Sequence, residues 1–158
     1  TYVCRMLAIA HQPRFAHFSL DDVYLTKAER VWRADNIASF SATRDEVGAY
    51  EVGHVSRPDI ERMLLTRGPP GTHDLALARR VIASLREGAP TSLPRFDKAT
   101  DDRAPETEWP MFQGPAQAIL LDGWCLGALP EPAPSDPIND VEREDVDGIW
   151  RKQASVEL

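Results

Sequence analysis

The segment AQAILLDG (residues 116–123) decides the fold class of this chain. Its apolar run, Ala116–Leu121, is closed by Asp122 and Gly123. A short apolar run bounded by a turn signal favours a strand that is buried on both faces, as in a parallel sheet. Because parallel strands are joined through crossover connections that are usually helical, the segment predicts an α/β architecture.

A second strand is predicted over residues 14–20, where side chains alternate between two faces. The two sets are Ala16, Phe18 and Leu20 on one side and Phe15, His17 and Ser19 on the other. This strand stops at Asp21 and Asp22. Ligands of open parallel sheets bind beyond the carboxyl ends of the strands, and Asp21 and Asp122 both lie at such ends. Together they outline a site for a cation or a phosphoryl group.

Helices are predicted between these strands. Residues 2–10 are mostly good helix formers and are apolar nearly all round, which is typical of a buried helix. Residues 26–34 are charged and helix-permissive. After the Gly/Pro-rich segment 66–74, Thr72 or Asp74 can cap a third helix. Its apolar face would carry Leu75, Ala78, Val81, Ile82 and Leu85.

The remaining segments predict mostly irregular structure. Residues 93–96 read as a short strand near a sheet edge, because Pro94 lacks a backbone donor. Residues 97–110 read as a loop, residues 31–58 as a loop insertion, and residues 129–137 as a proline-rich loop.

Composition narrows the class of protein. The 158 residues suffice for one domain with a core, and the net charge of −7 does not suggest a nucleic-acid or anionic-membrane partner. No apolar run approaches the roughly 20 residues of a transmembrane helix. The two cysteines, Cys4 and Cys125, are isolated, which predicts neither a disulfide framework nor a metal site and favours a reducing, cytoplasmic setting.

Four motifs occur in one order along the chain. They are SLDDVYL (19–25), TRGPPGTHD (66–74), LPRFDKATDDR (93–103) and ILLDGWCLGA (119–128). In combination they resemble the P-loop small-molecule kinases, specifically the D-glycerate 3-kinase family, whose relatives include uridine, pantothenate and phosphoribulokinases. The resemblance implies a P-loop NTPase-like parallel sheet flanked by helices.

The sequence departs from the family pattern in two respects. The family begins with a strand and a G-x-x-x-x-G-K-[ST] loop that cradles phosphates, and no such motif occurs in these 158 residues. We interpret Thr1 as the residue after that loop, which would place it near the nucleotide. Both ends look cut, so we expect residues 1–158 to form a single partial kinase domain, incomplete at both ends. Asp122 stands where the family more often has glutamate.

The resemblance assigns roles to the two strand-end carboxylates. Asp21 matches the family's catalytic base, which accepts the proton of the attacking hydroxyl. Asp122 would act as a Walker B acid that holds Mg²⁺ directly or through water, with Asp21 contributing to the same metal site. Asp22 would support Asp21.

Cationic and polar residues in the other motifs are candidates for the two substrates. A small acid suits the planar guanidinium group. The acceptor candidates are Arg67, His73, Arg95 and Arg103, with Lys98 as a weaker one. Arg151, like Thr1, is a candidate for the nucleotide side.

The sequence therefore predicts ATP-dependent phosphoryl transfer to the hydroxyl of a small acid, with D-glycerate as the expected acceptor and ATP and Mg²⁺ as cofactors. Two alternatives stay open. One is a kinase of the same superfamily with a nucleoside or pantothenate-like acceptor. The other is a non-catalytic remnant that binds a metabolite or a partner. The sequence leaves the oligomeric state undetermined.

Overall fold

The structure is a computed structural model that describes residues 2–10, 15–36, 62, 64–129 and 136. The chain divides into two compact units. The first joins Thr1–Lys27 to His73–Leu126, and the second joins Ala28–Thr72 to Gly127–Leu158. We describe each unit by itself, and the candidate site lies in the first.

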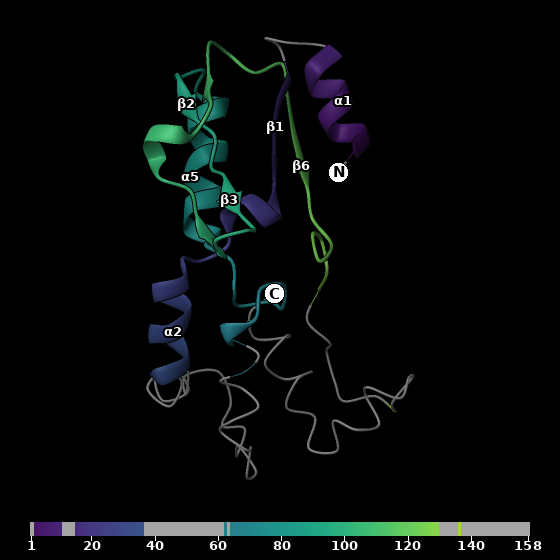
Figure 1. The fold of residues 1–158 in the computed structure, drawn as a ribbon. Coiled ribbons are helices and arrows are strands. Elements are labelled where there is room, and N and C mark those ends of the chain that lie inside the picture. Colours follow the sequence, from purple (N-terminus) through teal and green to yellow (C-terminus); the bar gives the residue numbers. More distant parts are fainter. Residues whose placement is uncertain (1, 11–14, 37–61, 63, 130–135, 137–158) are drawn as a thin grey trace. The chain divides into compact units, whose positions relative to one another are not determined.

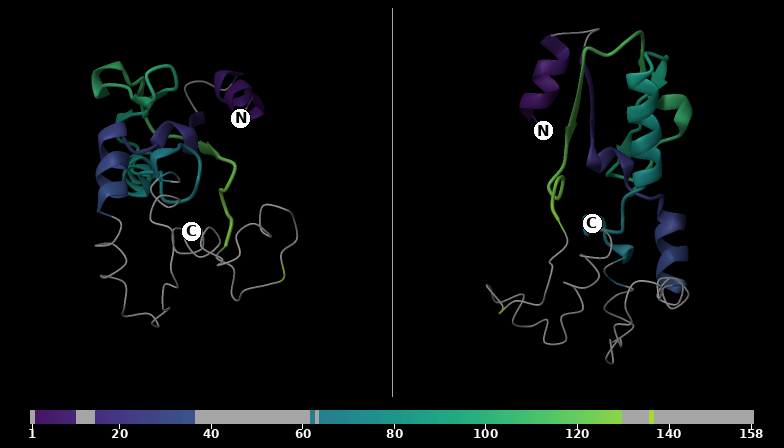
Figure 2. Two further views of the ribbon diagram at one scale, coloured as in Figure 1. Left: turned by 60° about the horizontal axis from the view of Figure 1, so that its bottom comes forward. Right: turned by 180° about the vertical axis from the view of Figure 1, so that it is seen from behind.

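A pair of parallel strands forms the centre of the first unit (Figure 1). Strand β1 (Phe15–Ser19) pairs with β6 (Ala118–Asp122), and the register runs from Phe15 opposite Ala118 to Ser19 opposite Asp122. The two predicted strands are thus confirmed, and their carboxyl ends meet. Helices flank the pair, with α1 on one side and α5 on the other (Figures 1 and 2). The predicted α/β class is confirmed.

Helix α1 (Tyr2–Ala10) forms where the sequence predicts it, but the prediction that it is buried is wrong. Among its residues only Ala8 is buried. The helix packs against β1 and β6 along one narrow face, so its broad apolar surface stays exposed within the described part of the chain. The exposed side chains are Tyr2, Val3, Met6, Leu7 and Ile9.

Strand β6 differs from its prediction in the same way. All five of its residues are half-buried rather than buried on both faces. Its strand neighbour within the described residues is β1, so no second strand covers its outer edge there. Strand β1 follows its predicted alternation more closely, since Ala16 and Phe18 are fully buried.

The core of this unit lies between β1 and helix α5 (Leu75–Arg86). The Asp74 carboxylate, one of the two capping residues that the sequence leaves open, caps α5 by accepting a hydrogen bond from the Leu77 backbone N–H. Just past the helix, Gly88 has a φ of 74°, which suits glycine. The buried cluster comprises Ala16, Phe18, Leu20, Val23, Leu77, Ala78, Val81, Leu85, Leu93 and Phe112.

Short antiparallel pairs replace the predicted strand at 93–96 and part of the predicted loop at 97–110. Strand β2 (Thr91–Ser92) pairs with β5 (Met111–Phe112), and β3 (Phe96–Asp97) pairs with β4 (Asp102–Arg103) to form a hairpin. Residues 93–95 separate the two pairs, because Pro94 has no N–H to donate to a ladder. A 3₁₀ turn, η2, spans Glu106–Glu108.

In the second unit, helix α2 (Lys27–Asp35, whose first residue belongs to the first unit) confirms the helix predicted at 26–34. It also makes residues 31–35 helical, where the sequence suggests the start of a loop insertion. Residues 37–61 and most of 129–137 lie outside the described residues. No helix in the described part of the chain is long and apolar enough to cross a membrane.

Candidate active site

The adjacent aspartates Asp21 and Asp22 lie in a 3₁₀ turn, η1 (Leu20–Val23), that directly follows β1. Ser19 Oγ accepts a hydrogen bond from the Asp21 backbone N–H at 3.2 Å, and Asp22 Oδ2 accepts one from the Ser19 backbone N–H at 2.9 Å. This reciprocal capping box gives Asp22 a structural task. The capping box does not use the side chain of Asp21.

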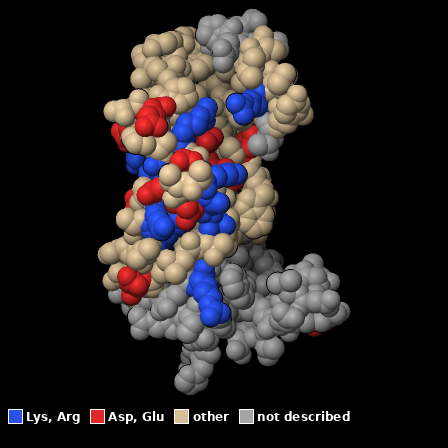
Figure 3. Space-filling view, in the orientation of Figure 1, with Lys and Arg blue, Asp and Glu red and all other residues tan. Residues whose placement is uncertain are grey.

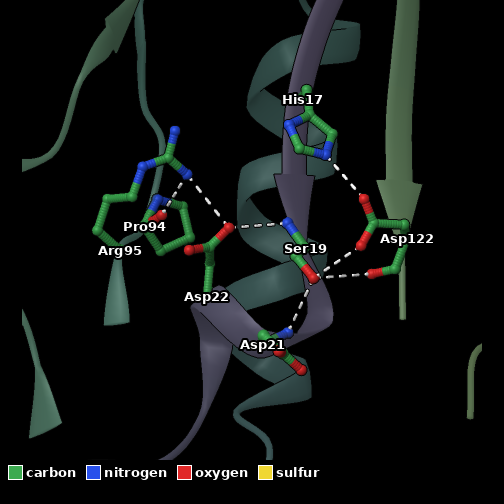
Figure 4. A network of polar contacts seen from close by, with 7 residues as sticks. All are labelled: His17, Ser19, Asp21, Asp22, Pro94, Arg95 and Asp122. Atoms are coloured by element: carbon green, nitrogen blue, oxygen red, sulfur yellow. Dashed lines mark hydrogen bonds and ion pairs between the residues drawn. The ribbon is translucent and has the colours of Figure 1, made fainter. Parts of the chain in front are cut away.

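Asp22 also accepts a hydrogen bond from Arg95, whose Nη1 lies 3.2 Å from Asp22 Oδ2 (Figure 4). Burial raises the pKa of Asp22 above its ordinary value, although the Ser19 hydrogen bond and the Arg95 charge oppose the rise. Arg95 Nη1 donates to the Pro94 carbonyl as well. The turn thus connects the end of β1 to the segment that precedes the β3–β4 hairpin.

Asp122, the last residue of β6, is held by two side chains of the neighbouring strand (Figure 4). Ser19 Oγ donates to Asp122 Oδ1 at 2.9 Å, and His17 Nε2 lies 2.8 Å from Asp122 Oδ2. Partial burial acts to raise the pKa of Asp122. The hydrogen bonds from His17 and Ser19 outweigh this effect and hold the pKa below its ordinary value.

Gly123 lets the end of β6 approach η1 closely. A Cβ atom added at Gly123 would lie 2.5 Å from Leu20 Cβ, closer than real side chains come. A larger residue would therefore push Asp122 away from Ser19. The requirement for glycine here comes from close packing of strand end against turn.

Asp21 and Asp122 line one pocket of about 280 Å³. Ser19 lies between them, and Gly123 and Trp124 complete the lining. The Trp124 side chain is largely exposed. The structure thus brings together the two carboxylates that the sequence predicts at one edge of the sheet.

The Asp21 carboxylate is engaged on both oxygens. Tyr24 Oη donates to Oδ1 at 3.1 Å, and Lys98 Nζ, from the hairpin, lies 2.7 Å from Oδ2. Partial burial acts to raise the pKa of Asp21, but the hydrogen bond and charge of Lys98, together with Tyr24, lower it below its ordinary value. Asp21 is therefore ionised at neutral pH. In the space-filling view, acidic and basic side chains interleave at mid-height, where Figure 1 places β3 (Figure 3).

His73 is stacked on Tyr24, with the ring centroids 4.5 Å apart. The residue is only 7% exposed, and its Nε2 has no hydrogen-bond partner among the described residues. Burial lowers the pKa of His73 to about 4, against a smaller opposing effect of the Asp21 charge. The imidazole is therefore neutral near pH 7 and retains an unused polar atom.

The two arginines predicted for the acceptor differ in their surroundings. Arg103 is 14% exposed; its Nε and Nη2 donate to the Tyr24 carbonyl at 3.1 and 2.8 Å, and Nη2 lies 3.3 Å from Asp74 Oδ2. Arg95 is 39% exposed. Both guanidinium groups are bound to the protein, but the Arg95 side chain is much more exposed than that of Arg103.

Three predicted site residues cannot be related to this pocket. Arg67 belongs to the second unit, and Thr1 and Arg151 lie outside the described residues. Their roles stay predictions.

The pocket's oxygen ligands match the chemistry of Mg²⁺. Proteins usually bind Mg²⁺ through one or two carboxylates, with substrate phosphates and water completing the shell. Asp21 and Asp122 supply two carboxylates to one pocket. No cluster of three or more histidine, cysteine, aspartate or glutamate side chains able to hold a metal occurs among the described residues.

Sequence reasoning assigned no role to His17 and Ser19, although the sequence carried a signal for each. The strand alternation places both on the same side of β1, the side opposite Ala16 and Phe18. Ser19 also begins an S-x-x-D pattern with Asp22, the signature of a capping box. The contact of His17 with Asp122, 105 positions away, depends on the pairing register of β1 and β6.

The parallel strand pair and its flanking helices define a structural class, the α/β proteins with a P-loop NTPase-like fold. Two solved structures share this fold. One, described as the structure of the YGR205w protein, has 20% sequence identity and a TM-score of 0.55 and covers 97% of this chain, a likeness of fold alone. The other is D-glycerate 3-kinase from Cryptococcus neoformans, with 28% identity, a TM-score of 0.58 and 95% coverage.

Within that class, the resemblance to the D-glycerate 3-kinase family is confirmed. The chloroplastic D-glycerate 3-kinase of Arabidopsis thaliana is 38% identical over 79 residues, which is 45% of this chain. The uncharacterized kinase mug58 of Schizosaccharomyces pombe is 28% identical over 120 residues, or 72% of this chain. The chain spans 17% and 36% of these curated relatives and 49% and 44% of the two solved structures. No protein-family model matches it.

Proposed function

We propose that the protein is an ATP-dependent kinase that transfers a phosphoryl group to a hydroxyl of D-glycerate. The observation that carries the proposal is the shared pocket of Asp21 and Asp122 at the carboxyl ends of two parallel strands. Similarity to D-glycerate 3-kinases supports the acceptor.

Asp21 accepts the proton of the attacking hydroxyl in this proposal. Phosphoryl transfer proceeds through a loose transition state, so the proton moves late and orientation of the nucleophile matters most. A carboxylate whose pKa is lowered suits that task, because it is always ionised and always ready to accept a hydrogen bond. Tyr24 and Lys98 fix its two oxygens in place.

Asp122 would hold Mg²⁺, directly or through water, and Asp21 lines the same pocket. A bound Mg²⁺ would supply positive charge to offset the negative charge that develops during transfer. The lowered pKa of Asp122 keeps this ligand charged, which a hard cation requires.

Arg95 and His73 bind the acceptor. The exposed part of the Arg95 side chain can pair with a carboxylate. The neutral His73 can hydrogen-bond a hydroxyl through Nε2 if acceptor binding uncovers this buried atom. Arg103 supports them by holding the Tyr24 backbone. Arg67 remains a proposed acceptor residue, and Thr1 and Arg151 remain proposed nucleotide residues.

The test is an assay of the protein expressed from its complete coding sequence. ADP release with D-glycerate, uridine or pantothenate as acceptor, together with ³¹P NMR of the product, identifies both the reaction and the acceptor. We expect a phosphoester with D-glycerate alone.

Two results would contradict this function. Preference for uridine or pantothenate would reassign the acceptor. Binding of D-glycerate without ADP release would indicate a protein that binds a metabolite and no longer phosphorylates it.

A further inference from the structure

We propose that His17 is a positioning residue that fixes the orientation of the Asp122 carboxylate for metal binding. This inference rests on the proposed function, because it assigns Asp122 to Mg²⁺. It concerns a side chain that itself lies outside the pocket lining.

The register of the two strands brings His17 to Asp122. Ser19 lies directly opposite Asp122, and His17 lies two residues earlier on the same face of β1, opposite Leu120. The Asp122 side chain therefore lies within hydrogen-bonding distance of both Ser19 and His17. Figure 4 shows the imidazole and the hydroxyl approaching the carboxylate from two directions.

Each donor engages a different oxygen of Asp122. His17 Nε2 is 2.8 Å from Oδ2 and Ser19 Oγ is 2.9 Å from Oδ1. An ionised carboxylate only accepts hydrogen bonds, so Nε2 of His17 carries the hydrogen. Hydrogen bonds to both oxygens restrict rotation of the carboxylate about the Cβ–Cγ bond of Asp122. Each oxygen still retains a lone pair for a ligand.

Ser19 alone does not fix this orientation. Its hydroxyl has one hydrogen to donate, and Oγ lies 2.9 Å from Asp122 Oδ1 and 3.3 Å from the Asp122 backbone carbonyl oxygen, so the two acceptors share it. The same oxygen accepts the N–H of Asp21. His17 is therefore the donor that holds Oδ2, and removing it frees the carboxylate to turn.

Partial burial strengthens the contact. The side chains of His17 and Asp122 are each 13% exposed, so water competes little for either group. Hydrogen-bonding partners that orient metal ligands typically contribute about 10- to 100-fold to metal affinity. The same order of effect is expected here.

The experiment measures Mn²⁺ binding by electron paramagnetic resonance, on the complete protein in the presence of saturating ADP. His17→Met and His17→Gln are a matched pair, because the two side chains have nearly the same length and only glutamine carries a donor near the position of Nε2. We expect the Mn²⁺ dissociation constant to rise about tenfold or more in His17→Met. In His17→Gln it should stay within about threefold of the wild type.

Two controls separate positioning from stability. Phe15→Met alters the same face of β1, two residues away from His17, and should leave Mn²⁺ binding unchanged. His17→Asn places its donor short of Nε2 and should behave like His17→Met, which preserves the test if His17→Met does not fold. Melting temperatures of all variants show whether the loss of affinity follows the loss of stability.

Equal Mn²⁺ affinity in wild type, His17→Met and His17→Asn would overturn the inference, as would a loss shared equally by His17→Gln. Absence of Mn²⁺ binding to the wild type would overturn both the inference and the metal role of Asp122. A wild type that binds Mn²⁺ but does not phosphorylate D-glycerate would contradict the proposed acceptor, while the histidine series would still decide the role of His17.

Discussion

Asp122 and Asp21 line the same pocket, but different parts of the molecule hold them. Asp122 receives its hydrogen bonds from His17 and Ser19, which belong to the strand paired with its own. Asp21 receives one from Lys98, an exposed residue of the β3–β4 hairpin 77 positions away. The strand pair therefore provides a fixed ligand, whereas the hairpin provides a partner that solvent and substrate can reach.

The largest expected effect is on kcat and concerns Asp21, which is proposed as the base, whereas Asp122 is proposed as the metal ligand. Asp21→Asn should lower kcat by about 10²- to 10⁴-fold with little change in the Michaelis constants, because the amide cannot accept the proton. Steady-state kinetics with D-glycerate and ATP measure this. The control is Asp101→Asn, which likewise replaces a carboxylate by an amide but lies in the hairpin. Asparagine tolerates the φ of 57° at this position. A kcat within threefold of wild type would exclude Asp21 as the base.

The part of the site near the β3–β4 hairpin can be tested by comparing Arg95, which precedes the hairpin, with Arg103, which belongs to it. Arg95→Lys keeps the charge but loses the planar geometry, so the Michaelis constant for the acceptor should rise about ten- to hundredfold, which corresponds to a charge-assisted hydrogen bond of about 1.5–3 kcal/mol. The constant for ATP should stay unchanged. If only the ATP constant rose, Arg95 would belong to the nucleotide side.

Arg103→Lys should act on stability instead. The substitution weakens the bonds to the Tyr24 carbonyl and leaves Asp74 poorly paired, at a cost of about 1–3 kcal/mol. Urea denaturation monitored by circular dichroism measures the free energy of unfolding. Unchanged stability with a raised acceptor constant would show that Arg103 contacts substrate.

The strand side can be tested at Gly123. Gly123→Ala introduces a methyl group that clashes with Leu20, and such overpacking typically costs about 1–3 kcal/mol. Because the strand end would shift, Mg²⁺ affinity should fall together with stability. A variant that kept both would show that Asp122 does not depend on this close approach.

The smallest expected effect concerns pH. Partial burial raises the pKa of Asp21, and Lys98 is the largest of the groups that lower it, so Lys98→Met should raise this pKa. Since activity requires ionised Asp21, the acidic limb of the pH profile of kcat/KM should move to higher pH. The shift should be small, because the Asp21 side chain is 36% exposed. Lys98→Arg should restore the wild-type profile, and identical profiles would remove Lys98 from this role.

Local sequence patterns sufficed to predict most of the β1–β6 strand pair and the carboxylates at its ends. The apolar run before Asp122 and the alternation before Asp21 gave both strands, and shared strand ends placed the carboxylates together. Burial was predicted poorly for α1 and β6, because sequence periodicity reports which residues are apolar and does not report what covers them.

The hairpin side was harder to predict. The pairs β2–β5 and β3–β4 are two residues long, too short to show an alternation. The different surroundings of Arg95 and Arg103 arise from contacts with Asp22 and Tyr24, more than 70 positions away. Such long-range contacts leave no local pattern.

The most direct test of the shared pocket is the Mg²⁺ dependence of Asp122→Asn, measured with its melting temperature in the complete protein. Loss of one charge facing a hard cation should raise the Mg²⁺ concentration needed for half-maximal activity by about tenfold or more, and Mn²⁺ should recover more activity than Mg²⁺. Stability should barely change, since the asparagine oxygen can accept the Ser19 hydrogen bond and its amide N–H can donate to His17 Nε2 once the imidazole changes tautomer. A stable variant with the wild-type Mg²⁺ curve, or a lowered melting temperature with unchanged metal dependence, would contradict the account.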